Sequence, residues 1–567
     1  MIKKIIFTFL FFISLFSYSI AQVDDIPLSN SVYEYLKIMS VKKVLPSINN
    51  GNPNLTRGEV MDYLNQIDSQ KSKLNTTELK ALKKYHTEFF LEEMNKDNSA
   101  LLLGRDDKLS KRIDDIFSVD KKKFLYAYKQ DNNNFFWSGI GHLYAAKEFK
   151  PDKDSTGEMV DMGTILKGTM FGHLGYYLSF YLGYSFSASS LNVLVDPRLA
   201  TNFKFSDIKE RTRSYNFTDG YLKYYAKPTD NMAISVQLGR EHTTYGLGYS
   251  NSLMLSGVTP DMDFLKFDMK WGIADFSSIH ASILGPYNVD KDSNYTKYIV
   301  LNRLNISFKN LFDFAFYEGQ VYSRGLELGY LTPFAFYKFV EMSIQDRDNG
   351  VFGMDFQTHC FKNVEIQGSF FLDEDILFNL QHLDSYTNKT AYQLGTYIYE
   401  PLNIKNLSMI IEYTKIRPFV YTHSKNFTEE SDKDTYTSYG VGLGHPIGPN
   451  SDQIFTKFIY NLNERMTFNF EYQHIRHGDN ITDANGILIK NVGGNIFAPW
   501  YGPRDSQTPV FLDGERINTD VYTLDFRYEP INSFLFDLIF NYQKSNNTYT
   551  NIKTENSFCF LRFTLDY

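Results

Sequence analysis

The chain ends in Phe558-Cys559-Phe560-Leu561-Arg562-Phe563-Thr564-Leu565-Asp566-Tyr567. Counted back from Tyr567, every second residue is apolar or aromatic, whereas Arg562, Thr564 and Asp566 lie between them. A period of two is the period of a β-strand, because successive side chains point to opposite faces of a sheet. A soluble β-sandwich could show the same alternation. A strand that runs to the last residue, with a terminal aromatic and a charged opposite face, is more typical of the closing strand of an outer-membrane barrel.

The same alternation recurs from about residue 123 onward, in segments separated by polar, Gly-rich or Asn-rich breaks. The clearest segments are Gly172–Ser187, Tyr221–Lys227, Ala233–Glu241, Phe264–Trp271, Tyr298–Phe308, Val364–Leu372, Tyr392–Tyr399, Met409–Ile416, Phe468–Gln473, Tyr522–Tyr528 and Phe534–Tyr542. Most are about ten residues long, which is the length of a tilted strand that crosses a bilayer. The sequence therefore predicts an all-β transmembrane barrel of about eighteen antiparallel strands over residues 123–567.

The composition agrees with a membrane barrel. Of 567 residues, 16% are aromatic, with 41 Tyr and 49 Phe against 3 Trp, as aromatic girdles at two membrane interfaces require. The mean hydropathy of -0.34 looks soluble, but alternation hides the apolar residues in every second position. The net charge of -8 argues against general binding of nucleic acid, which needs a basic face.

The N-terminus predicts export. Residues 1–21 combine Lys3 and Lys4 with an apolar core and end in Ser19-Ile20-Ala21, which is the pattern of a secretory signal peptide. No later apolar stretch reaches about eighteen residues, so the chain can span a membrane only as a closed barrel. The two cysteines, Cys360 and Cys559, are too few for a disulfide framework, and we expect both to be unpaired.

Residues 22–122 differ from the barrel and predict a small all-α domain on the periplasmic side. Three pairs have the spacing of a capping box: Ser31 with Glu34, Thr56 with Glu59, and Asn75 with Glu78. A helical apolar pattern follows each pair. A fourth helix is possible from Leu109 to Phe117.

The breaks between strands predict the orientation of the barrel. A short break such as Lys227–Asp230 is typical of a periplasmic turn. Three long breaks are typical of outer loops, namely Ala188–Thr218, Arg417–Tyr436 and His477–Asp520.

The middle of the chain carries longer motifs. They are Gly239-Arg240-Glu241, Tyr245-Gly246-Leu247-Gly248, Leu253-Met254-Leu255-Ser256, Leu326-Glu327-Leu328-Gly329-Tyr330 with Thr332-Pro333, Asp348-Asn349, Gly353-Met354-Asp355, Glu412-Tyr413-Thr414-Lys415-Ile416-Arg417-Pro418 and Tyr439-Gly440-Val441-Gly442-Leu443-Gly444-His445-Pro446. Together they resemble the Wzi family of capsule-assembly outer-membrane proteins, in the form found in Bacteroidetes-like bacteria. The resemblance implies an eighteen-stranded, occluded barrel with a periplasmic helical bundle, and a lectin-like role in holding exported capsular polysaccharide.

Several charged residues lie in or beside the expected strands. They are Arg240, Glu241, Arg324, Glu327, Glu341, Asp355, Glu412 and Arg417. Charges cannot cheaply face the hydrocarbon, so we expect them to point into the lumen. Opposite charges there would pair and make a rigid, plugged interior, which we favour over a ligand site.

Sugar contact is expected in outer loops, where aromatic faces can cover a pyranose and charged groups can bind its hydroxyl or acid groups. The best candidate contains Trp500, Tyr501 and Arg504, although an interfacial aromatic anchor would look the same. Arg198, Arg211 and Arg213 could bind an acidic polysaccharide or could be ordinary solvated charges.

No motif indicates an enzyme, a metal site or a cofactor. His474 and His477 are three apart, which places them on opposite faces of a continuous strand. No convincing Ser/His/acid set is present.

The sequence therefore predicts a non-enzymatic barrel of a Gram-negative outer membrane that binds or organises surface polysaccharide. Its expected partners are that polysaccharide, outer-membrane lipids and the barrel-assembly machinery during insertion, with no nucleic acid and a monomeric state. The alternatives are a porin or channel and, third, a surface hydrolase.

Overall fold

A computed structural model describes residues 22–90, 99–103, 109–187, 191–202, 213–288, 290–308, 310–373, 382–423 and 433–567. The expected signal peptide lies outside these residues. Among them, no helix is both long and apolar enough to cross a membrane.

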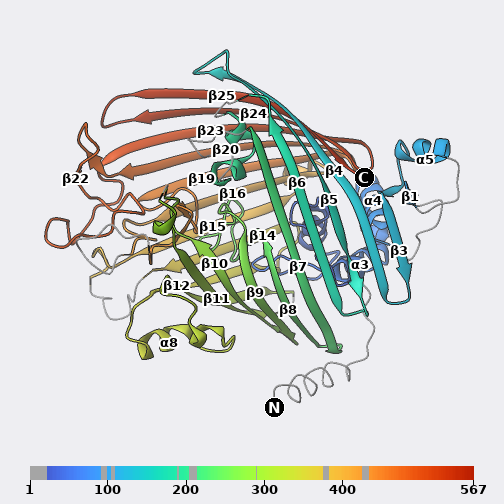
Figure 1. Cartoon of the computed structure of the whole chain (residues 1–567), viewed down its shortest axis with the longest axis horizontal. Helices are drawn as coiled ribbons and strands as arrows, with labels where there is room; N and C mark the ends of the chain where they lie inside the picture. The colour runs from blue at the N-terminus through green and yellow to red at the C-terminus, as the bar shows by residue number, and fades with distance from the viewer. Residues whose placement is uncertain are drawn as a thin grey trace.

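Eighteen antiparallel strands form a closed barrel (Figure 1). They are β4 (Asn133–Lys150), β5 (Thr156–Met170), β6 (Leu174–Ser185), β7 (Ser214–Thr229), β8 (Met232–Glu241), β9 (Met262–Trp271), β10 (Ala274–Leu284), β11 (Thr296–Ser307), β12 (Phe312–Tyr322), β13 (Asn349–Thr358), β14 (Val364–Leu372), β15 (Thr390–Tyr399), β16 (Leu407–Ile416), β19 (Ser451–Asn463), β20 (Met466–Asp479), β23 (Glu515–Ile531), β24 (Phe534–Asn547) and β25 (Lys553–Asp566). A short strand, β3 (Tyr126–Gln130), pairs with the first part of β4. The predicted fold class and strand number are confirmed.

The C-terminal strand closes the barrel, as its sequence predicted. β25 pairs with β4 from Ser557↔Lys150 to Asp566↔Ile140, and the backbone N–H and C=O of Tyr567 both bond to Gly139. Leu561 is 44% exposed on the outer wall, whereas Arg562 points inward and pairs with the buried carboxylate of Asp537 at 2.7 Å. The polar face of the strand therefore lines the lumen. Both cysteines are free, as expected.

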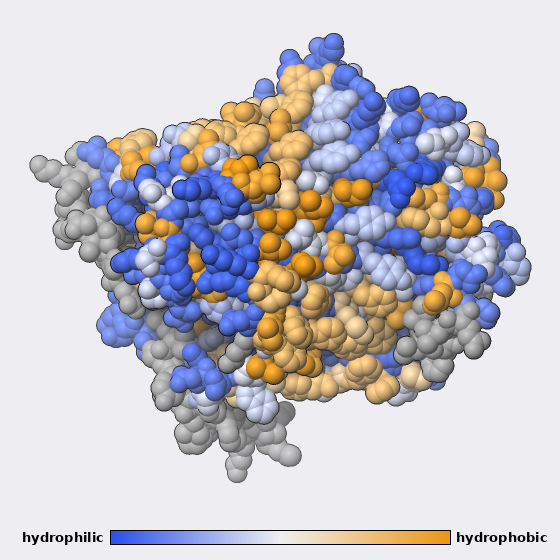
Figure 2. All heavy atoms as spheres, turned by 180° about the vertical axis from the view of Figure 1, so that it is seen from behind, coloured by the Kyte–Doolittle hydropathy of each residue, from blue (hydrophilic) through white to orange (hydrophobic). Residues whose placement is uncertain are grey.

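The two ends of the barrel differ in the length of their connections. At one end, tight turns such as 230–231, 272–273 and 532–533 join the strands. At the other end, long connections span 186–213, 242–261, 323–348, 417–450 and 480–514, and parts of some lie outside the described residues. The predicted turn near Asp230 lies at the end with tight turns. The three predicted long loops lie at the other end. Seen from behind, a band of hydrophobic residues separates two more hydrophilic ends (Figure 2).

The first described residues form helices α2 (Val32–Val41), α3 (Arg57–Asp68) and α4 (Thr76–Phe89), followed by α5 (Leu109–Ile116). Between α4 and β3, β1 (Ser99–Leu101) pairs in parallel with β2 (Lys122–Phe124). Buried side chains such as Leu36, Leu64 and Leu82 make one helical core.

Two of the three predicted capping boxes are present. Thr56 with Glu59 and Asn75 with Glu78 exchange both hydrogen bonds. The box at Ser31 is wrong, because the Glu34 carboxylate accepts instead from the Tyr397 hydroxyl of β15 at 2.8 Å.

The helices of residues 22–90 occupy the short-turn mouth of the barrel, whereas α5 lies to one side (Figure 1). The contact is partly apolar, because Tyr397, Ile410 and Ile459 of the barrel wall belong to the same buried cluster as the helical side chains. It is also ionic and polar: Lys223 of β7 pairs with Asp25 at 2.5 Å, Lys270 of β9 pairs with Glu59 at 2.6 Å, and the Asn75 amide donates to Asn406 at 2.8 Å. Burial alone would raise the pKa of Glu59, but the Lys270 ammonium and a backbone donation from Thr56 lower it to about 2. We call residues 22–90 the plug. A separable domain with its boundary at residue 122 stays a prediction.

Loops from the opposite end fold back into the lumen. Connection 242–261 forms a bridge between Tyr245 and Leu255, and an apolar cluster joins these residues to Tyr421, Tyr436 and Leu443 of connection 417–450. The latter connection includes β17 (Thr437–Ser438) and β18 (Val441–Gly442). The plug meets this layer directly, since the Gly246 N–H donates to the Gly51 carbonyl at 3.0 Å. A Cβ at Gly51 would meet the Arg303 guanidinium, which would have to shift.

Candidate functional site

Two of the predicted lumen charges are buried inside the barrel and support the loops. Asp355 of β13 pairs with Arg303 at 3.1 Å and accepts from the Ser369 hydroxyl at 2.8 Å. Glu412 of β16 accepts from the backbone N–H groups of Tyr249 and Ser250 at 2.8 and 2.9 Å. Both carboxylates therefore have partners within the wall or the lumenal loop, which is the arrangement expected of a structural network.

The other strand-end charges lie near the long-loop end. Glu241 accepts from the buried Gln237 amide at 2.9 Å on the lumenal side of β8. Arg417 is half-buried at the start of its connection, where its backbone bonds to Thr390 and Asn450. Arg240 corrects the prediction: it points outward and pairs with Asp263 at 2.9 Å, with the two side chains 45% and 64% exposed. At the end of a strand a long charged side chain can reach water outside the hydrocarbon layer, so Arg240 does not have to point into the lumen.

The prediction of a lumenal position is also wrong for Arg324, Glu327 and Glu341. All three belong to connection 323–348, which folds over the outside of the wall instead of entering the lumen. Arg324 bonds to Glu327 and to Asp348 within this connection, and Glu341 pairs with Lys338 at 2.8 Å. The connection supplies its own counter-charges, which the alternation of a strand could not reveal.

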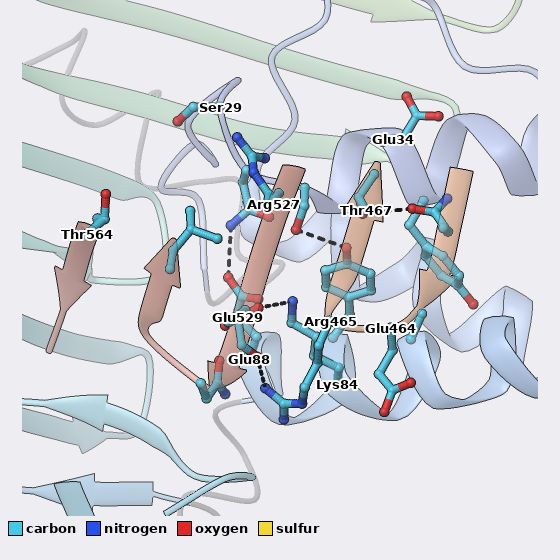
Figure 3. Close-up of a pocket in the computed structure, with 18 of the residues that line it drawn as sticks. Ser29, Glu34, Lys84, Glu88, Glu464, Arg465, Thr467, Arg527, Glu529 and Thr564 are labelled. Atoms are coloured by element: carbon cyan, nitrogen blue, oxygen red, sulfur yellow. Dashed lines mark hydrogen bonds and ion pairs between the residues drawn. The ribbon is translucent and has the colours of Figure 1, made fainter. Parts of the chain in front are cut away.

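A polar cavity of about 610 Å³ lies between the plug and strands β19 to β25 and β4 to β6. Figure 3 shows Lys84 of the plug, Arg465 and Glu529 close together at one side of it. Lys84 pairs with Glu529, while Arg527 and Arg562 both pair with Asp537, at 2.8 and 2.7 Å. Residues of both charges therefore line the cavity, and several of them are paired.

The arginines predicted in connection 186–213 separate in the structure. The segment folds inward as α6 (Leu191–Val195) and a short 3-10 helix, Pro197–Thr201, whose apolar side packs on β4 and β5. Arg198 borders the cavity, bonded to Asp196 at 2.7 Å and lying over the Phe217 ring at 4.2 Å. Arg213 is exposed and donates to the Phe186 carbonyl at 3.0 Å. Arg211 lies outside the described residues.

A second pocket of about 420 Å³ lies within connection 480–514 at the long-loop end. The connection contains a small hairpin, β21 (Ile481–Thr482) and β22 (Leu488–Lys490). The pocket is lined by Leu488, Ile489, Lys490, Asn491, Val492, Arg504, Asp505, Ser506, Thr508, Pro509, Val510 and Asp513. Apolar side chains and groups of both charges therefore surround one opening, as a site for a polyhydroxylated ligand requires.

The three residues predicted here have different roles in this connection. Trp500 stacks flat on Tyr386 of connection 373–389, with ring centroids 4.0 Å apart, so one face of the indole is covered. Tyr501 is buried, and its N–H donates to the Asp505 carboxylate at 2.8 Å. Arg504 is exposed over the Tyr501 ring and makes no ion pair with the residues that the structure describes. Of the three, Arg504 is best placed to meet a ligand.

Sequence analysis missed other pocket residues. Lys490 pairs with Asp513 at 2.7 Å, and the Asn491 amide donates to Asp505 at 2.8 Å. The turn residues Asp483 to Gly486 are a local signal that could have indicated the hairpin. No local pattern could show that the segment after it folds back onto this hairpin.

No group of metal-binding side chains forms among the described residues. His474 bonds to Asp520 and His477 to Ser451, so the two imidazoles do not converge.

The model of the family "Capsule assembly protein Wzi" matches residues 156–527. The structure of Wzi from Escherichia coli, described as an outer-membrane protein of group 1 capsule assembly and a carbohydrate-binding β-barrel, aligns over 96% of this chain and 99% of that chain. Its TM-score is 0.52 at 12% identity, which shows a shared fold.

Other matches are weaker. OprD of Pseudomonas aeruginosa aligns over 76% of this chain and 95% of that chain at 12% identity. Its TM-score of 0.41 is too low to support an inference about this chain. No curated protein matches the chain in sequence. Because the family model covers well over half of its residues, this chain belongs to the Wzi family of capsule assembly proteins.

Proposed function

We propose that this outer-membrane barrel binds surface polysaccharide without chemical conversion and helps to organise it at the cell surface. Membership of the Wzi family supports the proposal, as does the description of the Escherichia coli protein as a carbohydrate-binding barrel. The plug end faces the periplasm in this proposal, because short turns are periplasmic in bacterial barrels and long connections are external.

The outer-loop pocket is the observation that carries the proposal. Its open edge holds Arg504 and Lys490, which can donate charge-assisted hydrogen bonds to the carboxylate or hydroxyl groups of an acidic sugar. Leu488, Ile489 and Val510 supply apolar contact for a sugar ring. The ligand class that fits is thus a polysaccharide segment with hydroxyl or acid groups that Arg504 can bind.

Binding of the purified protein to an array of bacterial surface glycans tests the proposal. We expect Arg504→Ala to weaken binding by about tenfold, since a hydrogen bond to a charged group contributes about 1.5 kcal/mol or more. Lys553→Ala is the matched control, because Lys553 is an exposed cation at the same end of the barrel, on β25. Equal binding by the two variants would move the site away from this pocket.

A porin is the second candidate, favoured only by the polar cavity above the plug. Conductance in a planar bilayer separates the two functions. Steady conductance without glycan binding would support a porin and overturn the proposed function. We further propose contact with outer-membrane lipids, insertion by the barrel-assembly machinery and a monomeric state.

A further inference from the structure

The connection between β12 and β13, residues 323–348, lies on the outside of the barrel wall, beside β12 (Figure 1). We call it the strap. It contains a 3-10 helix, Leu328–Leu331, and the helix α8 (Tyr337–Ser343). On β10, Ser277 bonds to Tyr245 inside the lumen, so Ser278 points outward; the Tyr337 hydroxyl of the strap meets it at 3.1 Å.

The wall beneath the strap carries polar side chains at outward positions. Asn302 of β11 points outward, because the next residue in the strand, Arg303, points inward and bonds to Asp355. Glu318 of β12 is the cross-strand partner of Asn302 and therefore shares its face. Outward positions of a barrel normally meet lipid, where a carboxylate or an amide is costly.

The strap supplies hydrogen-bond partners to these polar groups. The Tyr337 N–H donates to Glu318 at 2.9 Å, and Asn302 donates to the Ala335 carbonyl at 2.9 Å. Gln320 donates to Glu341 of α8 at 3.1 Å. All these wall side chains are buried. Removing the strap would expose a row of polar groups on the outer wall, of which Asn302 and Glu318 would keep only their mutual hydrogen bond at 3.3 Å.

The opposite side of the strap is apolar and exposed. Six side chains, between 41% and 71% exposed, make up this face: Leu326, Leu328, Phe334, Phe336, Phe339 and Met342. The face continues the apolar wall on both sides. Phe334 stacks on Phe276 of β10, with ring centroids 5.2 Å apart, and Phe336 lies 6.3 Å from Phe352 of β13.

The height of the covered patch places it within the membrane. Glu318 follows the start of β12 at Phe312 by six residues, which is about 20 Å along a strand. With a tilt of about 40°, the rise along the membrane normal is roughly 15 Å, and the apolar band of such barrels is about 25 Å tall. Glu318 therefore lies at a height where lipid would contact it.

We propose that the strap lies in the outer leaflet and that its six apolar side chains contact lipid acyl chains. The strap thereby replaces a polar section of the wall with an apolar one. Continuity with the lipid-facing aromatics of β10 and β13 identifies the occupant as lipid. This interaction is independent of the polysaccharide site, so loss of glycan binding and failure of this proposal are separate results.

Fluorophore labelling of the full-length protein in phospholipid liposomes tests the proposal. In a background of Cys360→Ser and Cys559→Ala, a polarity-sensitive fluorophore is attached through Phe339→Cys or, in a second variant, Met342→Cys. Ile489→Cys is the matched control, because Ile489 is an apolar residue of similar exposure in the outer-loop pocket. Heat-modifiable migration on gels verifies that each variant is folded.

We expect lipids carrying a doxyl group on the acyl chain to quench the two strap labels several-fold more strongly than the control label. Aqueous iodide should show the reverse order. Strap labels as accessible to iodide as the control would overturn the proposal, because the strap would then project into water. Protection from both quenchers would also overturn it, because protein rather than lipid would then cover the face.

Discussion

The ion pair between Glu59 of the plug and Lys270 of β9 allows a quantitative test of how the plug is held. Glu59→Gln removes the charge but keeps a side-chain oxygen for the Thr56 N–H, so the capping box of α3 survives. A fall in the pKa of Glu59 from 4.5 to about 2 corresponds to at most about 3.4 kcal/mol. Lys270 is 47% exposed, so solvent screening reduces the expected contribution to about 1–2 kcal/mol.

Amide hydrogen exchange of α3 measures this contribution as a local opening free energy. In liposomes at pH 7, we expect Glu59→Gln to lower the protection of α3 by roughly 5- to 30-fold, with little change in the barrel strands. A double-mutant cycle with Lys270→Gln isolates the pair, because the two charges should show coupling. Added salt should reduce the coupling.

The pH dependence follows from the direction of the shift. The pKa of Glu59 is lower in the folded protein, so the stabilisation is full above the unfolded value of about 4.5 and is lost as the pH falls towards 2. The difference in α3 protection between the wild type and Glu59→Gln should disappear as the pH falls from about 4.5 to 2. Equal protection at pH 7, or a difference that persists at pH 2, would refute the electrostatic account.

Three other perturbations test separate parts of the structure. Deleting residues 22–122 should leave a heat-modifiable barrel with raised conductance, because all eighteen strands follow residue 122 and the helices occupy the mouth; loss of heat-modifiable migration would argue against a separable domain. Asp537→Asn should destabilise the barrel by about 1.5–3 kcal/mol, because two lumenal arginines, 36% and 31% exposed, lose their hydrogen bonds to a charged group; an unchanged temperature of heat modification would contradict this. Tyr386→Ala should expose the indole of Trp500 and shift tryptophan emission to the red, whereas an unchanged spectrum would mean that the stacking does not shield it.

Local patterns predicted much of the fold. The alternation in the last ten residues correctly placed Arg562 and Leu561 on opposite faces, which are the lumen and the outer wall in the structure, since the period of a strand depends on neighbouring residues alone. The capping boxes at Thr56 and Asn75 were equally local. The box at Ser31 failed because its acid, Glu34, bonds to a barrel strand far away in the sequence.

The sequence by itself determined the barrel, the approximate number of its strands, the alternation of faces along each strand, and the difference between short turns and long connections. These properties follow from residue spacing, turn chemistry and the cost of placing charge in lipid. Only the tertiary structure decided which connections enter the lumen, that the strap with Glu341 covers the outside of the wall, and that Tyr386 covers Trp500. The physical reason is that these positions depend on contacts between segments far apart in the chain, and the period of any one segment carries no information about its distant partner.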